Sequence, residues 1–123
     1  MSDTKENLQN AKVMIEAGEV ETARITLLEI LKDEPNNSAA LLMLAGAYFY
    51  AQMYAEAELV YKRLLEAEPG SGMLSIAMFN TLWKLERHAD AAEEIRRFIA
   101  VADKVQERET IERYAEIVKT IAE

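Results

Sequence analysis

Apolar residues recur along the chain at the three- and four-residue spacing of amphipathic helices, in successive blocks of similar length. Breakers separate these blocks at regular intervals. Gly18 closes a first block that begins near Asp3 or Thr4, and residues 35–38, Pro-Asn-Asn-Ser, close the second. We expect Ser38 to be the N-cap of the next helix. The pattern predicts an all-α chain of helical hairpins with tight turns at 52–53 and 86–87.

Pro35 and Pro69 lie 34 residues apart, and residues of the same kind recur at the same offsets. The aligned positions are Ala23, Ala57 and Ala91; Leu27, Tyr61 and Ile95; Ile30, Leu64 and Phe98; Leu31, Leu65 and Ile99. The alanines allow two helices to approach closely, and the large residues fill the space beside them. Three such units predict stacked hairpins with one continuous core.

The units occupy about residues 4–37, 38–71 and 72–103, and an amphipathic segment follows at about 104–122. In that segment Ile111, Tyr114, Val118 and Ile121 recur at helical spacing. We expect it to cap the third unit. At 123 residues, the chain is predicted to be a single domain over residues 1–123.

The second unit resembles a tetratricopeptide repeat. Its helix A packing residues are Leu41, Leu44, Ala45 and Tyr48, and its helix B residues and closing proline are Ala57, Tyr61, Leu64 and Pro69. The first unit matches more loosely, because Asn7 and Asn10 replace large apolar residues, and the third has Phe79 where the family has a small residue. The resemblance implies a right-handed superhelix of three hairpins plus a capping helix, with the A helices on the concave side.

Composition narrows the possible partners and locations. The net charge of −8 disfavours nucleic acid and anionic membrane, and the absence of cysteine excludes disulfides and thiolate metal sites. The apolar run 39–51 is too short to span a bilayer, and residues 1–10 do not resemble a secretory signal. We therefore expect a cytoplasmic protein without a membrane or nucleic-acid partner.

Helix A of the second unit is apolar nearly all round, yet the resemblance implies that one face of each helix A lines an open groove. The groove residues that this implies are Leu8, Lys12, Ile15, Glu16, Leu42, Gly46, Phe49, Tyr50, Met73, Ile76, Asn80, Trp83 and Lys84. Exposed apolar strips of this kind mark partner sites. The alternatives are that the chain's own C-terminal helix or a second copy covers the strip, or that these residues belong to the core.

Gly46 lies inside a predicted helix, where glycine is destabilising. Its presence suggests that a neighbouring helix or a ligand approaches the backbone closely, and the sequence does not distinguish the two. The family's clamp for the carboxylates of a chaperone tail needs five positions, which here hold Leu8, Lys12, Gly46, Met73 and Ala77. Only Lys12 is basic, so we do not expect binding by that clamp.

Catalytic or metal-binding motifs are missing from the sequence. His88 is the only histidine, and its alignment with Val20 and Tyr54 predicts a packing residue at the start of a helix B. We interpret the Glu93 and Glu94 pair as solvated surface. No enzyme activity, metal or cofactor is predicted.

The sequence therefore predicts a protein-interaction module, an adaptor or chaperone, that binds a peptide or helical segment of another protein. Partner side chains would be buried against Phe49, Tyr50, Ile76 and Trp83, while polar residues such as Lys12 would fix the register. The runner-up is a structural or self-associating protein whose apolar strip is a homodimer interface.

Overall fold

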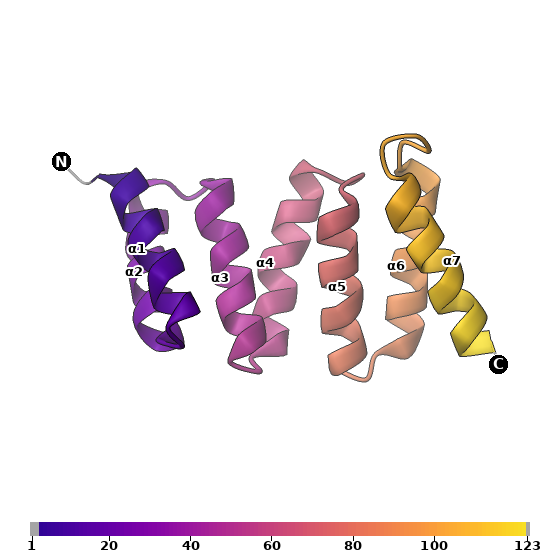
Figure 1. Cartoon of the computed structure of the whole chain (residues 1–123), viewed down its shortest axis with the longest axis horizontal. Helices are drawn as coiled ribbons and strands as arrows, with labels where there is room; N and C mark the ends of the chain where they lie inside the picture. The colour runs from indigo at the N-terminus through magenta and orange to yellow at the C-terminus, as the bar shows by residue number, and fades with distance from the viewer. Residues whose placement is uncertain (1–2, 123) are drawn as a thin grey trace. The chain divides into compact units, whose positions relative to one another are not determined.

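The computed structural model describes residues 3–122, and within them the chain forms seven α-helices joined by short turns (Figure 1). The helices are α1 (Thr4–Glu16), α2 (Val20–Asp33), α3 (Ser38–Tyr50), α4 (Tyr54–Ala67), α5 (Gly72–Lys84), α6 (His88–Val101) and α7 (Arg108–Ala122). The predicted all-α chain of helical hairpins is confirmed.

The helices divide into two compact units, and the boundary falls between Leu64 and Leu65, inside α4. We call them the N-terminal unit and the C-terminal unit. The single domain predicted from the sequence stays a prediction.

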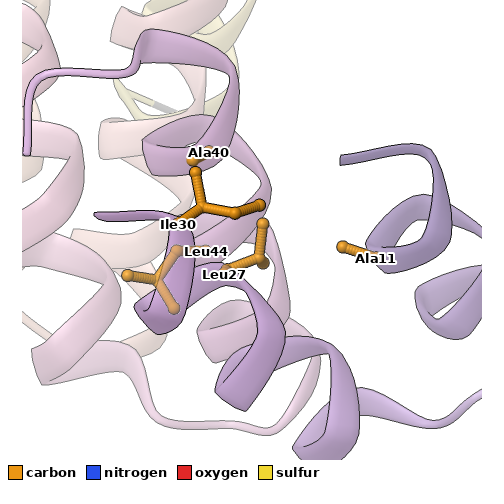
Figure 2. Close-up of a cluster of buried hydrophobic side chains, with 5 residues drawn as sticks. All are labelled: Ala11, Leu27, Ile30, Ala40 and Leu44. Carbon is orange, nitrogen blue, oxygen red and sulfur yellow. The ribbon is translucent and has the colours of Figure 1, made fainter. Parts of the chain in front are cut away.

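Small and branched apolar residues from three helices form the core of the N-terminal unit. The helices α1 and α2 pack as a hairpin, and α3 contacts both of them. Ala11 of α1, Leu27 and Ile30 of α2, and Ala40 and Leu44 of α3 are buried in one cluster (Figure 2). The two alanines have no large side chain to keep the helices apart, so the leucines and the isoleucine can fill the remaining space.

Three aromatic rings meet in the core of the C-terminal unit. The helix α5 packs against both α6 and α7. The Tyr114 ring of α7 is buried against Phe79 of α5 and Phe98 of α6, with ring centroids 5.8 and 5.6 Å away. Phe79 stands where the other two repeats have Ala11 and Ala45, so its extra volume is used in contact with α7. The predicted capping of the third hairpin by the C-terminal segment therefore has a specific aromatic basis.

Three N-caps recur with the repeat period. The side chains of Asp3, Asn37 and Ser71 each accept a hydrogen bond from the backbone N–H three residues later, at the starts of α1, α3 and α5. The prediction of Ser38 as the cap of α3 was wrong, because Asn37 takes this role and Ser38 is the first helical residue. Asparagine and serine are both strong N-caps, so residue type alone did not separate the two positions.

Three left-handed residues recur with the same period. Gly18, Gln52 and Glu86 have φ values of +82°, +62° and +60°, and each follows a helix A by two residues. Their N–H groups donate to the carbonyls of Ile15, Phe49 and Trp83. This left-handed ending satisfies carbonyls at the end of the helix and turns the chain into helix B.

Two arginines tie helix B to the loop that precedes its own hairpin. Arg63 donates to the carbonyl of Pro35 at 2.8 Å, and Arg97 donates to the carbonyl of Pro69 at 2.8 Å. Both pairs lie 28 residues apart in sequence. The closing prolines thus contribute a carbonyl acceptor as well as a break in the helix.

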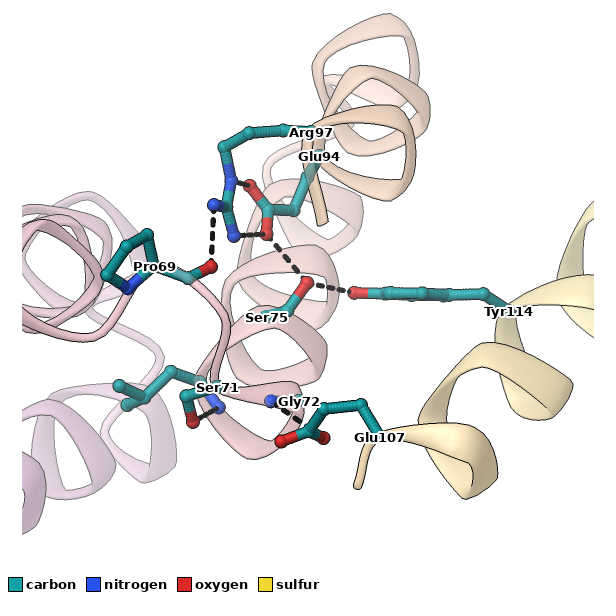
Figure 3. A network of polar contacts seen from close by, with 9 residues as sticks. Pro69, Ser71, Gly72, Ser75, Glu94, Arg97, Glu107 and Tyr114 are labelled. Carbon is teal, nitrogen blue, oxygen red and sulfur yellow. Dashed lines mark hydrogen bonds and ion pairs between the residues drawn. The ribbon is translucent and has the colours of Figure 1, made fainter. Parts of the chain in front are cut away.

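A buried polar network connects three helices of the C-terminal unit (Figure 3). The Glu94 carboxylate, only 7% exposed, accepts hydrogen bonds from Ser75 at 2.6 Å and from two nitrogens of Arg97 at 2.7 Å. Glu94 was therefore wrongly predicted to be solvated surface, whereas its neighbour Glu93 is exposed. Burial of the carboxylate is tolerated because the arginine and the serine satisfy its oxygens.

Candidate functional site

The thirteen predicted groove residues are all at least partly exposed. We call them the A-helix surface, and we separate the residues of each unit. The N-terminal face consists of Leu8, Lys12, Ile15, Glu16, Leu42, Gly46, Phe49 and Tyr50. The C-terminal face consists of Met73, Ile76, Asn80, Trp83 and Lys84. Their role in partner binding stays a prediction, but none of them is a fully buried core residue.

The N-terminal face lies on α1 and α3, which contact each other. Tyr50 is 74% exposed and Leu42 is also exposed, so α3 presents large apolar groups to solvent. Leu8 and Ile15 of α1 are half-buried and also pack against the core cluster. The α3 half of this face is therefore the more available for a partner.

Phe49 is held in place by the start of helix B. Its ring meets the Tyr54 ring edge-on, with centroids 5.2 Å apart. The equivalent pair in the next repeat is Trp83 with His88, whose ring centroids lie 4.0 Å apart. In both repeats an aromatic side chain near the end of helix A is thus positioned by the first residue of helix B.

Gly46 has open space where a side chain would begin. A Cβ atom added there would meet nothing within 4 Å. Of the two alternatives that the sequence left open, a neighbouring helix or a ligand close to the backbone, the first is therefore excluded for residues 3–122. The glycine instead leaves a gap in the exposed face of α3.

The N-terminal face carries charge only on its α1 side, since residues 38–50 of α3 include no charged side chain. Lys12 and Glu16 are exposed and have neither an ion pair nor a hydrogen bond from their side chains to any residue within 3–122. These two side chains are available to a partner without breaking an existing contact.

The C-terminal face is centred on Trp83, which is 39% exposed. Its indole stacks on Phe79, with ring centroids 5.7 Å apart, and also contacts His88. Met73 is 63% exposed on the same helix, α5. His88 was predicted to be a packing residue, and it does pack against Trp83, but its side chain is exposed rather than buried.

An open cavity of about 420 Å³ lies in the C-terminal unit, between the loop that precedes α5 and the loop that precedes α7. Its lining includes Glu68, Asp103 and Glu107. Asp103 accepts hydrogen bonds from the backbone N–H groups of Val105 and Gln106, and Glu107 accepts one from Gly72. Two of the three carboxylates thus fix the path of the chain between α6 and α7.

The described part of the chain contains no cluster of three or more histidine, aspartate or glutamate residues with the geometry of a metal site. None of the helices within residues 3–122 has the length and apolar character needed to cross a membrane.

Comparison with known families and structures agrees with this fold. A family model described as tetratricopeptide repeat matches residues 39–71, and a comparison with curated protein sequences finds no match. The structure of the first TPR of Spaghetti (RPAP3) bound to the HSP90 peptide SRMEEVD is similar over 98% of this chain and 96% of that one, with a TM-score of 0.75 and 14% identity.

Structures of MamA are also similar. The structure of a MamA point mutant matches 84% of this chain and 75% of its own length, with a TM-score of 0.73 and 16% identity. The MamA RS-1 ArsTM double mutant matches 83% of this chain but only 58% of its own length, with a TM-score of 0.71 and 23% identity. This chain therefore spans little more than half of the second MamA structure, and at these identities the likenesses show the fold alone.

The sequence match and the shared fold coincide in the second hairpin. Its packing residues are buried as the repeat pattern requires, except for half-buried Tyr48. Residues 39–71 are therefore a tetratricopeptide repeat, and the chain has the fold of the tetratricopeptide repeat structure that it matches over 98% of its length.

Proposed function

We propose that this protein is an adaptor or chaperone that binds an apolar peptide or helical segment of a partner protein on the A-helix surface. Tetratricopeptide repeats are protein-interaction modules, which gives the general class of function. The observation that carries the specific proposal is the exposure of Leu42, Tyr50, Met73 and Trp83 on helices A. Large apolar and aromatic side chains held exposed on the same helices mark an interaction surface better than scattered ones do.

Aromatic residues supply the binding free energy in this proposal. Burying one exposed aromatic side chain against a partner contributes about 2 kcal/mol or more when it forms a hot spot. Trp83 and Phe49 are already positioned by His88 and Tyr54, so less side-chain entropy is lost when they are buried.

The preferred partner differs from the acidic peptide in the RPAP3 structure. That peptide, SRMEEVD, carries three carboxylate side chains. The A-helix surface of this chain offers only Lys12 and Lys84 as cations, and the whole chain has a net charge of −8. An acidic tail would be repelled, whereas an apolar segment loses little by leaving water for this surface.

A catalytic role is not part of this proposal, because the repeat fold is a scaffold that is typically non-catalytic. We propose that the protein acts in the cytoplasm, in keeping with its acidic composition.

The proposal is tested by selecting peptides from a displayed random library against the full chain and measuring their affinities. Tyr50→Asp and Trp83→Asp should weaken the selected peptides by about tenfold or more. Leu59→Asp is the matched control, because Leu59 is 69% exposed on helix α4, which is a helix B and carries none of the A-helix surface. Peptides weakened by Leu59→Asp but not by the other two changes would contradict the proposal.

A further inference from the structure

The internal packing of the chain does not account for Gly46. This residue lies in the middle of α3, does not have a positive φ, and has no atom within 4 Å of the place a Cβ would take. Glycine in a helix interior destabilises the helix relative to alanine. Neither a turn nor a contact among residues 3–122 requires a glycine at this position, so the open space beside it is free for a partner.

The surface around Gly46 indicates which backbone conformation a partner would have. The α3 residues of the N-terminal face are Leu42, Gly46, Phe49 and Tyr50, none of which has an amide or charged side chain. An extended peptide brings backbone N–H and C=O groups that need hydrogen-bond partners when they are buried. A helix satisfies these groups internally, so a surface nearly devoid of donors and acceptors suits a helix.

The open space at Gly46 also indicates how closely the partner helix packs against α3. Helix axes lie about 8–10 Å apart depending on the side chains at the crossing, and small residues allow the shorter separations. A glycine on α3 gives close packing only if the opposing residue is small as well, because a large one would hold the two backbones apart.

The α1 side of the N-terminal face carries the charge that would orient the partner. Lys12 occupies on α1 the repeat position that Gly46 occupies on α3, is exposed, and has no partner among residues 3–122. A helix lying over α3 would therefore gain from a carboxylate placed beside Lys12 and away from Glu16, which is exposed four residues further along α1. A charge directly over α3 would lose its water without finding a partner.

We propose that the N-terminal face binds an amphipathic helix of a partner protein that crosses α3 at Gly46. The partner helix places glycine, alanine or serine at the crossing and a glutamate or aspartate beside Lys12. This inference rests on the proposed function and specifies the partner's conformation and its central residue.

The test uses two displayed peptide libraries selected against the full chain. One is a helical scaffold of about five turns with one face randomised, and the other carries the same randomised positions between regularly spaced prolines, which enforce an extended chain. We expect binders from the helical library alone, with a small residue at the centre and an acidic residue on one edge.

Variants of the chain then locate the binding site. Gly46→Leu should weaken a selected helix by about tenfold or more, while Ala55→Leu, which adds a large side chain at an exposed position of α4, should leave its affinity unchanged. Gly46→Ala should keep or raise the melting temperature, because alanine favours a helix more than glycine does, and it should still weaken binding. Weaker binding of this variant could then not be caused by misfolding. Lys12→Glu should weaken binding, and exchanging the acidic residue of the peptide for lysine should restore it.

Three results would overturn this inference. They are binders from the extended library, large residues selected at the centre, and affinities insensitive to Gly46→Leu. A chain that sediments as a dimer and dissociates on Gly46→Leu would assign the face to a second copy, which also overturns it. If binding is lost on Tyr50→Asp but is insensitive to Gly46→Leu, this inference fails and the proposed function stands. If neither library yields a binder, both the inference and the proposed function fail.

Discussion

The hydroxyls of Ser75 and Tyr114 share a hydrogen bond of 2.6 Å although the residues are 39 positions apart in the sequence. Because the single hydroxyl proton of Ser75 is donated to Glu94, Tyr114 is the donor in this bond. The chain of bonds runs from Tyr114 of α7 through Ser75 of α5 to Glu94 of α6 (Figure 3). One side chain of α7 thus packs in the aromatic core and is linked through Ser75 to the buried carboxylate of the C-terminal unit.

The first prediction concerns this bond. Tyr114→Phe should lower the free energy of unfolding by about 1–2 kcal/mol, because it removes the hydroxyl and leaves an acceptor site of buried Ser75 unsatisfied. Tyr114→Ala should cost about 3–5 kcal/mol, since it also leaves a cavity beside Phe98. Urea denaturation followed by circular dichroism measures both changes. Tyr50→Phe is the control, because Tyr50 is exposed, and an equal effect of both Phe variants would contradict the assignment.

The second prediction concerns alkaline pH. Burial, with a further contribution from the Glu94 carboxylate, raises the pKa of Tyr114 to about 12 from its ordinary value of 10.0. The unfolded chain therefore loses this proton first, and stability that is fully present below pH 10 should fall as the pH rises toward 12. Ionisation of Tyr114 should lower the free energy of unfolding by roughly 2–3 kcal/mol. Comparing wild type with Tyr114→Phe across this range isolates it, and parallel curves for the two proteins would show that the pKa is not raised.

The third prediction concerns the left-handed residues that end the A helices. Gln52→Gly and Glu86→Gly should each stabilise the fold by about 0.5–1 kcal/mol, because only glycine adopts a positive φ without steric cost. Gly18→Ala should destabilise it by a similar amount, although a Cβ there would meet nothing within 4 Å. Thermal unfolding measures all three. A stabilising effect of Gly18→Ala would disprove this account of the turn.

The hairpins could be predicted from sequence because the small and large core positions recur with the period. Ala23, Ala57 and Ala91 are each completely buried, as their alignment predicted. In the middle of α1, Asn10 interrupts this recurrence of apolar core residues, and it does so for a physical reason. Asn10 is exposed, while its counterparts Leu44 and Met78 are buried, so the residue type follows the local exposure of each helix A.

The buried network of the C-terminal unit could not be predicted, because it depends on contacts between distant segments. Glu94 lies on a helix rich in charged residues, and neither its spacing nor its neighbours separate it from exposed Glu93. The equivalent positions in the other repeats hold Thr26 and Val60, so the period offers no signal either. Only the packing of α7 brings Tyr114 close enough to complete the network.

The candidate surface was predictable in part. The family's positional pattern selected residues that are all partly exposed, but it did not reveal that Gly46 faces open space. A glycine that fits against a neighbouring helix and one that faces solvent have the same sequence context. The three-dimensional surroundings of the Cβ position were needed to separate them.

The fourth prediction separates surface from core in the C-terminal unit. Trp83→Ala should lower the free energy of unfolding by about 1–2 kcal/mol, because the indole is only partly buried. Phe98→Ala should lower it by about 3–5 kcal/mol, because Phe98 is fully buried. Emission of Trp83, the only tryptophan, should also be quenched by acrylamide in the free protein. An unquenchable tryptophan with a Phe98-like stability cost would place Trp83 in the core.

The most direct test of the account is a methyl-resolved NMR titration of the full chain with a peptide selected from the displayed library. We predict that methyl signals of Leu42, Met73 and Ile76 shift on binding, because these side chains lie on the A-helix surface. Signals of Ile25 and Leu59, which are exposed on α2 and α4, should not shift. Shifts confined to Ile25 and Leu59, with none on the A-helix surface, would contradict the account.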